Sequence, residues 1–154
     1  MSRRDLLSLC VLAGVLAACS PKSPAEPQGA AAVPGSAIGA TAGNAGLTAE
    51  QVGERIYSGN CVPCHQQNGA GIPGVYPSLA GSAVVTGDPV ELARWVMQGQ
   101  RPHSMPAGRY STQMLQFGWM KPADVAALFS YLRSNFGNSA GPVDAATVAK
   151  ALGP

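Results

Sequence analysis

The sequence predicts an all-α fold. Three segments repeat apolar residues at the spacing of one helix face, and residues that start or stop helices bound each of them. No two segments show the alternation of apolar and polar residues that indicates paired β-strands. We therefore expect three to five helices joined by loops.

The first predicted helix occupies residues 48–59. It opens with Thr48, followed three positions later by Gln51, which is the pattern of a capping box. Gly53 lies one turn before Tyr57 on the same side of this helix. We expect a second helix to approach closely at the glycine, with the tyrosine ring packed beside it.

Two further helices are predicted nearer the C-terminus. One, residues 88–99, has Asp88 as its cap residue, a proline in its first turn and Gly99 at its end. The other, residues 122–136, begins at Pro122, repeats apolar residues at helical spacing and stops before a glycine. The first and last helices bracket the folded part of the chain, so we expect their apolar faces to cross.

The segment after the first helix is Cys61-Val62-Pro63-Cys64-His65. This C-x-x-C-H pattern is the attachment signature of a c-type haem. Each thiol can add to one vinyl group of the porphyrin, and the histidine then lies under the macrocycle as an axial iron ligand. The segment therefore predicts one covalently bound haem c, with the helices wrapped around it.

Three other interpretations of this segment compete: a chance match, half of a zinc site, or a thioredoxin-like dithiol. A zinc site needs a second pair of ligands, whereas the remaining cysteines are Cys10 and Cys19 and the remaining histidine is His103. A thioredoxin-type motif lies between a strand and a helix, and no apolar strand pattern surrounds this one. Haem is the favoured interpretation.

Residues 1–18 have the features of a signal peptide. A short basic start precedes an apolar run that is too short to span a membrane as a mature helix. The run ends in Leu-Ala-Ala-Cys, which resembles the bacterial lipobox, and this predicts lipidation of Cys19. The alternative is an ordinary cleavage site beside a free thiol at Cys19. Lipidation would anchor the protein on the periplasmic side of the inner or the outer membrane.

The rest of the chain divides by composition. Residues 19–46 are rich in Ala, Pro, Gly and Ser, which predicts a flexible tether. Residues 47–138 form one predicted domain, small enough that a core of side chains alone is marginal, and a buried haem would supply the missing apolar volume. Residues 139–154 form a tail with some helical character and no identifiable partner.

Two segments of the domain resemble class I c-type cytochromes. Residues 57–71, which contain the C-x-x-C-H pattern, and residues 76–81, which read Tyr-Pro-Ser-Leu-Ala-Gly, are similar to that family's haem-binding segments. The resemblance implies a small cytochrome c fold. It also implies that the carbonyl of Pro77 accepts a hydrogen bond from the outer imidazole nitrogen of His65, and that Leu79 packs against the macrocycle.

The same resemblance implies a methionine as the second axial ligand. Met114 has the family's usual place, a few residues before a phenylalanine and the final helix, although leucine replaces the usual proline after it. Met105 is followed by proline but lies farther from the helix. Met120, and His103 as an imidazole, remain alternatives.

Ligation by histidine and methionine predicts an electron carrier and not an enzyme, because six-coordinate iron has no site for a substrate. The first hypothesis is a membrane-tethered carrier between a dehydrogenase or quinol-oxidising complex and a terminal acceptor. The second is a haem subunit of a membrane dehydrogenase, since residues 117–138 resemble such subunits. The third is a haem sensor or peroxidase with an open distal site.

The expected partners are redox proteins, including a terminal oxidase as a possible acceptor, and the protein is expected to be a monomer or a subunit of a complex. The chain has 10 lysines and arginines against 8 acidic residues. A nucleic-acid-binding domain needs a basic cluster well beyond this balance, so nucleic acid is excluded as an expected partner.

Overall fold

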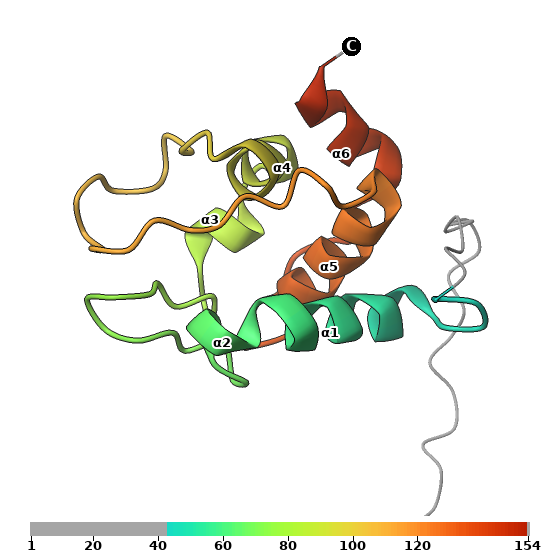
Figure 1. Cartoon of the computed structure of the whole chain (residues 1–154), viewed down its shortest axis with the longest axis horizontal. Coiled ribbons are helices and arrows are strands. Elements are labelled where there is room, and N and C mark those ends of the chain that lie inside the picture. Colours follow the sequence, from blue (N-terminus) through green and yellow to red (C-terminus); the bar gives the residue numbers. More distant parts are fainter. Residues whose placement is uncertain (1–42, 154) are drawn as a thin grey trace, which may run out of the picture. The chain divides into compact units, whose positions relative to one another are not determined.

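The computed structural model describes residues 43–153, and Figure 1 shows them as helices joined by long loops. The predicted signal peptide, residues 1–18, and the predicted lipidation site at Cys19 lie outside the described residues. So does nearly all of the predicted tether, residues 19–46.

The fold is all-α, as predicted. Between residues 43 and 153 there is no β-strand, only an isolated bridge between Ile72 and Tyr76. Two of the helices, α2 and α3, are single turns of four residues. The helices in chain order are α1 (Ala49–Asn60), α2 (Val62–His65), α3 (Ala83–Thr86), α4 (Pro89–Gln98), α5 (Pro122–Ser134) and α6 (Ala145–Leu152).

The predicted starts of α1 and α4 are confirmed by their caps, and α5 begins at Pro122 as predicted. Thr48 and Gln51 form the capping box at α1: the Thr48 hydroxyl accepts from the Gln51 N–H at 3.3 Å, and the Thr48 N–H donates to the Gln51 side chain at 2.9 Å. At α4 the Asp88 carboxylate accepts from the Val90 N–H at 2.8 Å. Gly99 ends α4 with a φ of 71°, a left-handed conformation that favours glycine.

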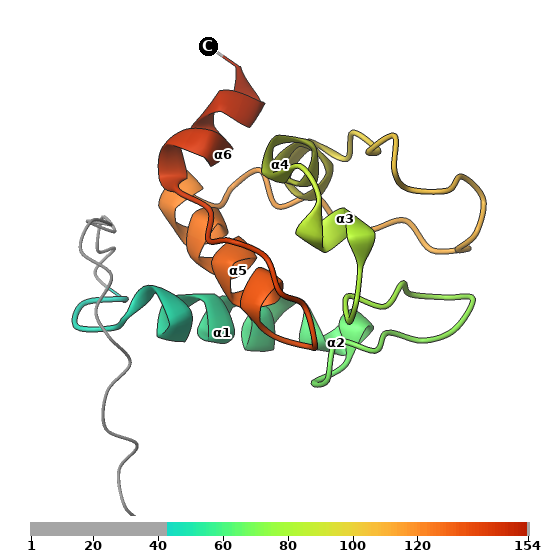
Figure 2. The ribbon, with the colours of Figure 1, turned by 180° about the vertical axis from the view of Figure 1, so that it is seen from behind.

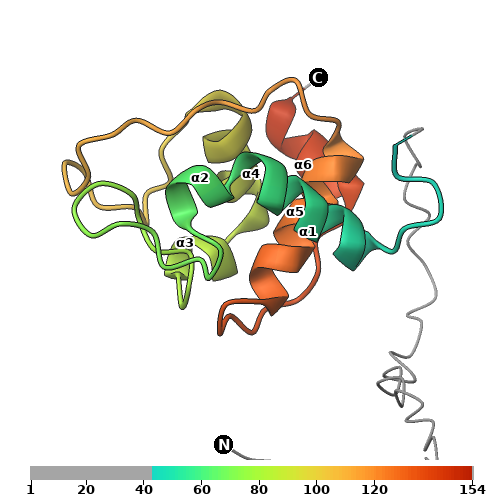
Figure 3. The same ribbon diagram turned by 60° about the horizontal axis from the view of Figure 1, so that its bottom comes forward.

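The crossing of α1 and α5 organises the domain (Figure 1 and Figure 3). Gly53 lies against the backbone of α5, where a Cβ atom on it would meet the Ala127 carbonyl oxygen and come within 2.6 Å of the Tyr131 Cβ atom. The Tyr57 ring packs beside this contact, with its centroid 5.8 Å from that of Tyr131. The predicted close approach of a second helix at Gly53 is therefore confirmed.

The last predicted helix, residues 122–136, ends two residues early. Asn135 is extended, and Phe136 has a φ of 57°, which is uncommon outside glycine. This turn directs the Phe136 ring back onto Tyr57, with a centroid distance of 4.9 Å. Packing of the ring against α1 therefore takes the place of two more helical residues.

The C-terminal segment is part of the fold. Helix α6 packs against α4 and α5 (Figure 2), and its Val148 is fully buried. The Ser130 hydroxyl on α5 accepts from the Val143 N–H at 3.0 Å, and the Arg94 Nε on α4 donates to the Ala151 carbonyl at 3.3 Å. The folded part therefore extends beyond residue 138, the last residue of the predicted domain. No helix between residues 43 and 153 has the length and apolar character needed to cross a membrane.

Candidate haem-binding site

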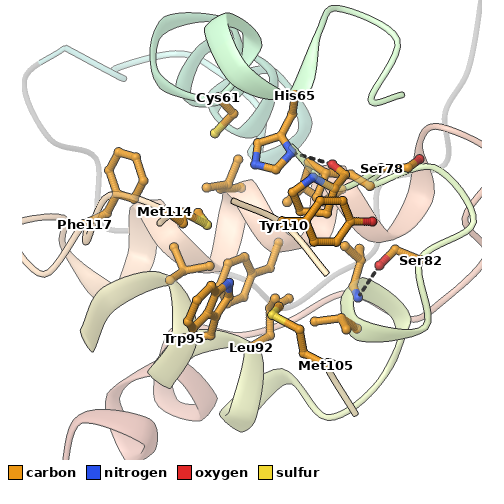
Figure 4. Close-up of a pocket in the computed structure, with 18 of the residues that line it drawn as sticks. Cys61, His65, Ser78, Ser82, Leu92, Trp95, Met105, Tyr110, Met114 and Phe117 are labelled. Carbon is orange, nitrogen blue, oxygen red and sulfur yellow. Dashed lines mark hydrogen bonds between the residues drawn. The ribbon is translucent and has the colours of Figure 1, made fainter. Parts of the chain in front are cut away.

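A large apolar cavity lies between the C-x-x-C-H segment and the helices opposite it (Figure 4). The empty space inside it is about 930 Å³, counting the open space at its mouth. Cys61 and His65 line one side of the cavity. The opposite walls come from α3, α4 and α5, through Val84, Val85, Leu92, Trp95, Val96, Leu128, Phe129 and Leu132.

His65 is held in one orientation. Its side chain is buried, and its Nδ1 atom lies 2.9 Å from the carbonyl oxygen of Pro77 (Figure 4). A carbonyl can only accept, so Nδ1 carries the proton and Nε2 keeps a free lone pair, which is the state needed to bind iron. Burial lowers the pKa of His65, and the hydrogen bond to Pro77 opposes this effect. The imidazole is therefore suited to act as a neutral ligand.

The loop after α2 brings Pro77 to His65. Gly71 has a φ of 66°, and a Cβ atom on it would lie 2.7 Å from the carbonyl carbon of Pro77. The Gly71 N–H also donates to the His65 carbonyl at 2.9 Å. A residue with a side chain would thus block the return of the loop. Leu79, two residues beyond Pro77, lines the cavity. This position is consistent with the expected contact between Leu79 and the macrocycle.

The two cysteines lie at the junction of α1 and α2. Cys61 caps the end of α1 and is buried, whereas Cys64 is half-buried one turn later. Burial, together with the neighbouring Cys64, raises the pKa of the Cys61 thiol to about 11 in the chain without haem. Between residues 43 and 153 no group of three His, Cys, Asp or Glu side chains could hold a metal ion, so Cys61 and Cys64 have no further zinc ligands nearby.

The candidate distal ligands differ in whether they line the cavity. Met105, Met114 and Met120 all line the cavity. His103 does not, because its side chain is 99% exposed and lies 3.3 Å from the Glu91 carboxylate. The structure therefore brings three methionines to the cavity and leaves the candidate histidine at the surface.

Two buried polar residues near the cavity were not singled out from the sequence. The Asn138 amide donates to the carbonyls of Leu79 and Leu132, at 2.9 and 2.8 Å, and accepts from the Ser82 N–H at 3.2 Å. It thereby ties the cavity loop to the end of α5. The other is Arg133, which lies one turn after Phe129 on the apolar side of α5. A charged residue on the apolar side of a helix is the sequence feature that could have pointed to it.

Comparison with known proteins gives the family. The cytochrome c family model matches residues 50–136, more than half of the chain. The chain belongs to the cytochrome c family. It is 31% identical over 96 residues to cytochrome c-552 of Thermus thermophilus, a match that covers 59% of this chain and 64% of that protein.

Other relatives are named as parts of an enzyme complex. The chain is 32% identical over 101 residues to the cytochrome c subunit of alcohol dehydrogenase (quinone) of Gluconobacter oxydans. This match covers 64% of the chain but 21% of the subunit. The corresponding subunit of Gluconacetobacter polyoxogenes is 31% identical over 111 residues, covering 68% of the chain and 23% of the subunit. The chain thus spans about a fifth of the length of these subunits.

Membership of the family decides between the interpretations of the C-x-x-C-H segment. As a member of this family, the protein binds haem c covalently, with Cys61 and Cys64 in the attachment segment. The residues of the site fit this group: the cavity walls are apolar, and the free Nε2 of His65 belongs to a residue that lines the cavity. The chance, zinc and dithiol interpretations are set aside.

Proposed function

We propose that this protein is a one-electron carrier whose haem iron is bound by His65 and Met114. The observation that carries the proposal is the pairing of an oriented, buried imidazole with thioether side chains in one apolar cavity. Haem c, when bound, supplies an iron that changes oxidation state by one electron. A neutral thioether ligand favours the reduced state, and occupation of both axial positions leaves no site for a substrate.

The support for Met114 over Met105 is local anchoring. Three residues after Met114, the buried Phe117 donates its N–H to the Val96 carbonyl of α4 at 2.9 Å. Met105 is held by a turn within its own loop, in which its N–H donates to the Pro102 carbonyl at 3.1 Å, and the four residues that follow it are exposed. A ligand that must stay in place during electron transfer is better supported by the anchored segment.

The test compares two alanine substitutions. Met114→Ala should abolish the red-region charge-transfer band between thioether and iron in the oxidised protein, because that band requires the sulfur ligand. Met105→Ala is the matched control, since it removes a thioether from the same cavity and should leave the band unchanged. Loss of the band in Met105→Ala, with retention in Met114→Ala, would transfer the role to Met105.

The proposal places the carrier on the periplasmic side of a bacterial membrane. Its support is the signal-peptide pattern in residues 1–18 and the lipobox-like sequence that ends at Cys19. A flexible tether over residues 19–46 would have a root-mean-square reach of about 30 Å. Mass spectrometry of the membrane-bound protein should find a lipidated Cys19 as its first residue, and an unmodified amino terminus would refute the anchor.

A second candidate function is that of a cytochrome subunit in a dehydrogenase complex. The observation in its favour is the similarity to the cytochrome c subunits of quinone alcohol dehydrogenases. Purification from membranes at high salt distinguishes the two. A carrier should separate from its redox partners, whereas a subunit should remain bound to a flavin or quinone enzyme.

A further inference from the structure

Arg133 on α5 is a buried cation whose hydrogen bonds all go to neutral groups. Arg133 is 9% exposed. Its Nη1 donates to the carbonyls of Val85 and Gly87, each at 2.8 Å, and its Nε donates to the carbonyl of Gly141 at 2.8 Å. Within residues 43–153 the one ion pair is that of His103 with Glu91, so no carboxylate of this part of the chain lies within 4.0 Å of the guanidinium.

The charge lies directly behind the wall of the haem cavity. Val85, whose carbonyl Arg133 binds, is 2% exposed and lines the cavity. Leu132, its neighbour on α5, is 5% exposed and also lines the cavity. Arg133 itself does not line the cavity, so its connection to the site runs through these two apolar residues of the wall.

A charge in this position acts on the cavity with little screening. Carbonyl groups carry dipoles but no net charge, so the three hydrogen bonds leave the positive charge of the guanidinium uncompensated. The effective dielectric constant of a protein interior is well below that of water, and salt screens a buried charge much less than an exposed one. By contrast, the exposed Arg55 on α1 faces solvent.

We propose that the buried charge of Arg133 raises the reduction potential of the haem in the adjacent cavity. Uptake of one electron lowers the positive charge of the iron centre by one, so a nearby fixed cation destabilises the oxidised state relative to the reduced state. This inference rests on the proposed electron-carrier function. It assigns to Arg133 a part in setting the reduction potential of the haem. In this role Arg133 is a tuning residue that acts through the field in the cavity and touches neither the ligands nor the iron.

A purely structural role makes a different prediction. If Arg133 only held the structure together, its effect on the potential would come from its three hydrogen bonds. Any replacement would then loosen the junction of α3, α5 and the segment before α6. Arg133→Lys keeps the charge and loses part of the hydrogen bonding. Arg133→Gln keeps polar atoms and loses the charge. The two variants therefore separate charge from bonding.

The experiment is a redox titration of the haem-loaded full chain at low and at high salt. Arg133→Gln should shift the midpoint potential to a lower value at both salt concentrations, whereas Arg133→Lys should keep the potential of the parent protein. Arg55→Gln is the matched control for an exposed arginine, and any shift it causes should disappear at high salt. An unchanged potential in Arg133→Gln, or an equal fall in Arg133→Gln and Arg133→Lys, would overturn the proposal.

A second pair of variants keeps the test decisive if Arg133→Gln does not fold with haem. Gly141 is exposed, and a Cβ atom on it would meet nothing within 4 Å. Gly141→Asp would add a carboxylate beside the guanidinium, and Gly141→Asn is its neutral match. At low salt the potential of Gly141→Asp should lie below that of Gly141→Asn, and equal potentials would overturn the proposal.

The proposed function is checked separately on the same samples. The charge-transfer band of each oxidised variant reports whether the thioether remains bound to the iron. A lower potential with the band intact is an effect of charge. A band absent from the parent protein would instead contradict methionine ligation, whatever the potentials of the Arg133 variants.

Discussion

Substitution of Gly53 by alanine should separate α1 from α5 and destabilise the domain. The added methyl group would meet the Ala127 carbonyl oxygen and would lie 2.6 Å from the Tyr131 Cβ atom, where ordinary van der Waals contact begins at 3.4 Å. Neither neighbour can rotate away, because one is backbone and the other is the first side-chain atom. The two helices must therefore move apart by about 1 Å, since side-chain rotation cannot relieve the contact.

The size of the effect follows from two opposing terms. Overpacking of a tight interface costs about 1 to 3 kcal/mol, and the rigid backbone contact places Gly53→Ala near the upper end. Replacing a helical glycine with alanine gains about 1 kcal/mol from helix propensity. We therefore expect a net loss of about 2 kcal/mol in the free energy of unfolding.

The same helix provides the matched control. Gly59 also lies in α1 but is exposed, and a Cβ atom on it would meet nothing within 4 Å. Gly59→Ala should gain up to about 1 kcal/mol, because only the propensity term remains. Urea unfolding of the haem-loaded proteins, followed by far-ultraviolet circular dichroism, measures both. If Gly53→Ala were as stable as Gly59→Ala, the explanation based on helix contact would be wrong.

Two further predictions concern polar side chains. Asn138→Ala should lower the free energy of unfolding by about 2 kcal/mol, because one buried and two part-buried backbone groups lose their partner, and the urea midpoint should fall at constant slope. An unchanged midpoint would show that water replaces the amide. Asp144 caps α6, and hydrogen bonds from Thr147 lower its pKa below the ordinary value of 3.8. Its stabilising effect is present above pH 3.8 and should be lost as the pH falls through the lowered pKa. Asp144→Asn should remove this acid dependence. An acid unfolding profile of Asp144→Asn equal to that of the parent protein would contradict the assignment.

Local signals predicted α1 and α4, which both begin with a side-chain cap. Thr48 and Asp88 act within three residues of their own positions, so their effect can be recognised in the sequence. The contact at Gly53 was also predictable, because a glycine one turn before a buried tyrosine leaves room for another helix. The signals for these features lie among neighbouring residues, even where the contact itself, as at Gly53, is made with a distant helix.

Features set by distant contacts were not predictable in the same way. The early end of α5 depends on Phe136 turning back to Tyr57, which lies on another helix. The docking of α6 depends on a surface that exists once α4 and α5 have packed. At the site, the hydrogen bond of His65 to Pro77 was expected from family resemblance, whereas nothing in the spacing of Asn138 pointed to its three backbone partners.

The residues on the two sides of the haem cavity are held in place by contacts that span different distances along the chain. His65 is oriented within its own loop, but Met114 depends on an anchor from Phe117 to the Val96 carbonyl of α4. Helix α4 is in turn held by α6, through burial and through the hydrogen bond of Arg94 to Ala151. The C-terminal helix lies beyond the region matched by the family, yet it braces the element that anchors the proposed distal ligand. Loosening α6 should therefore weaken the thioether–iron bond before it disturbs His65.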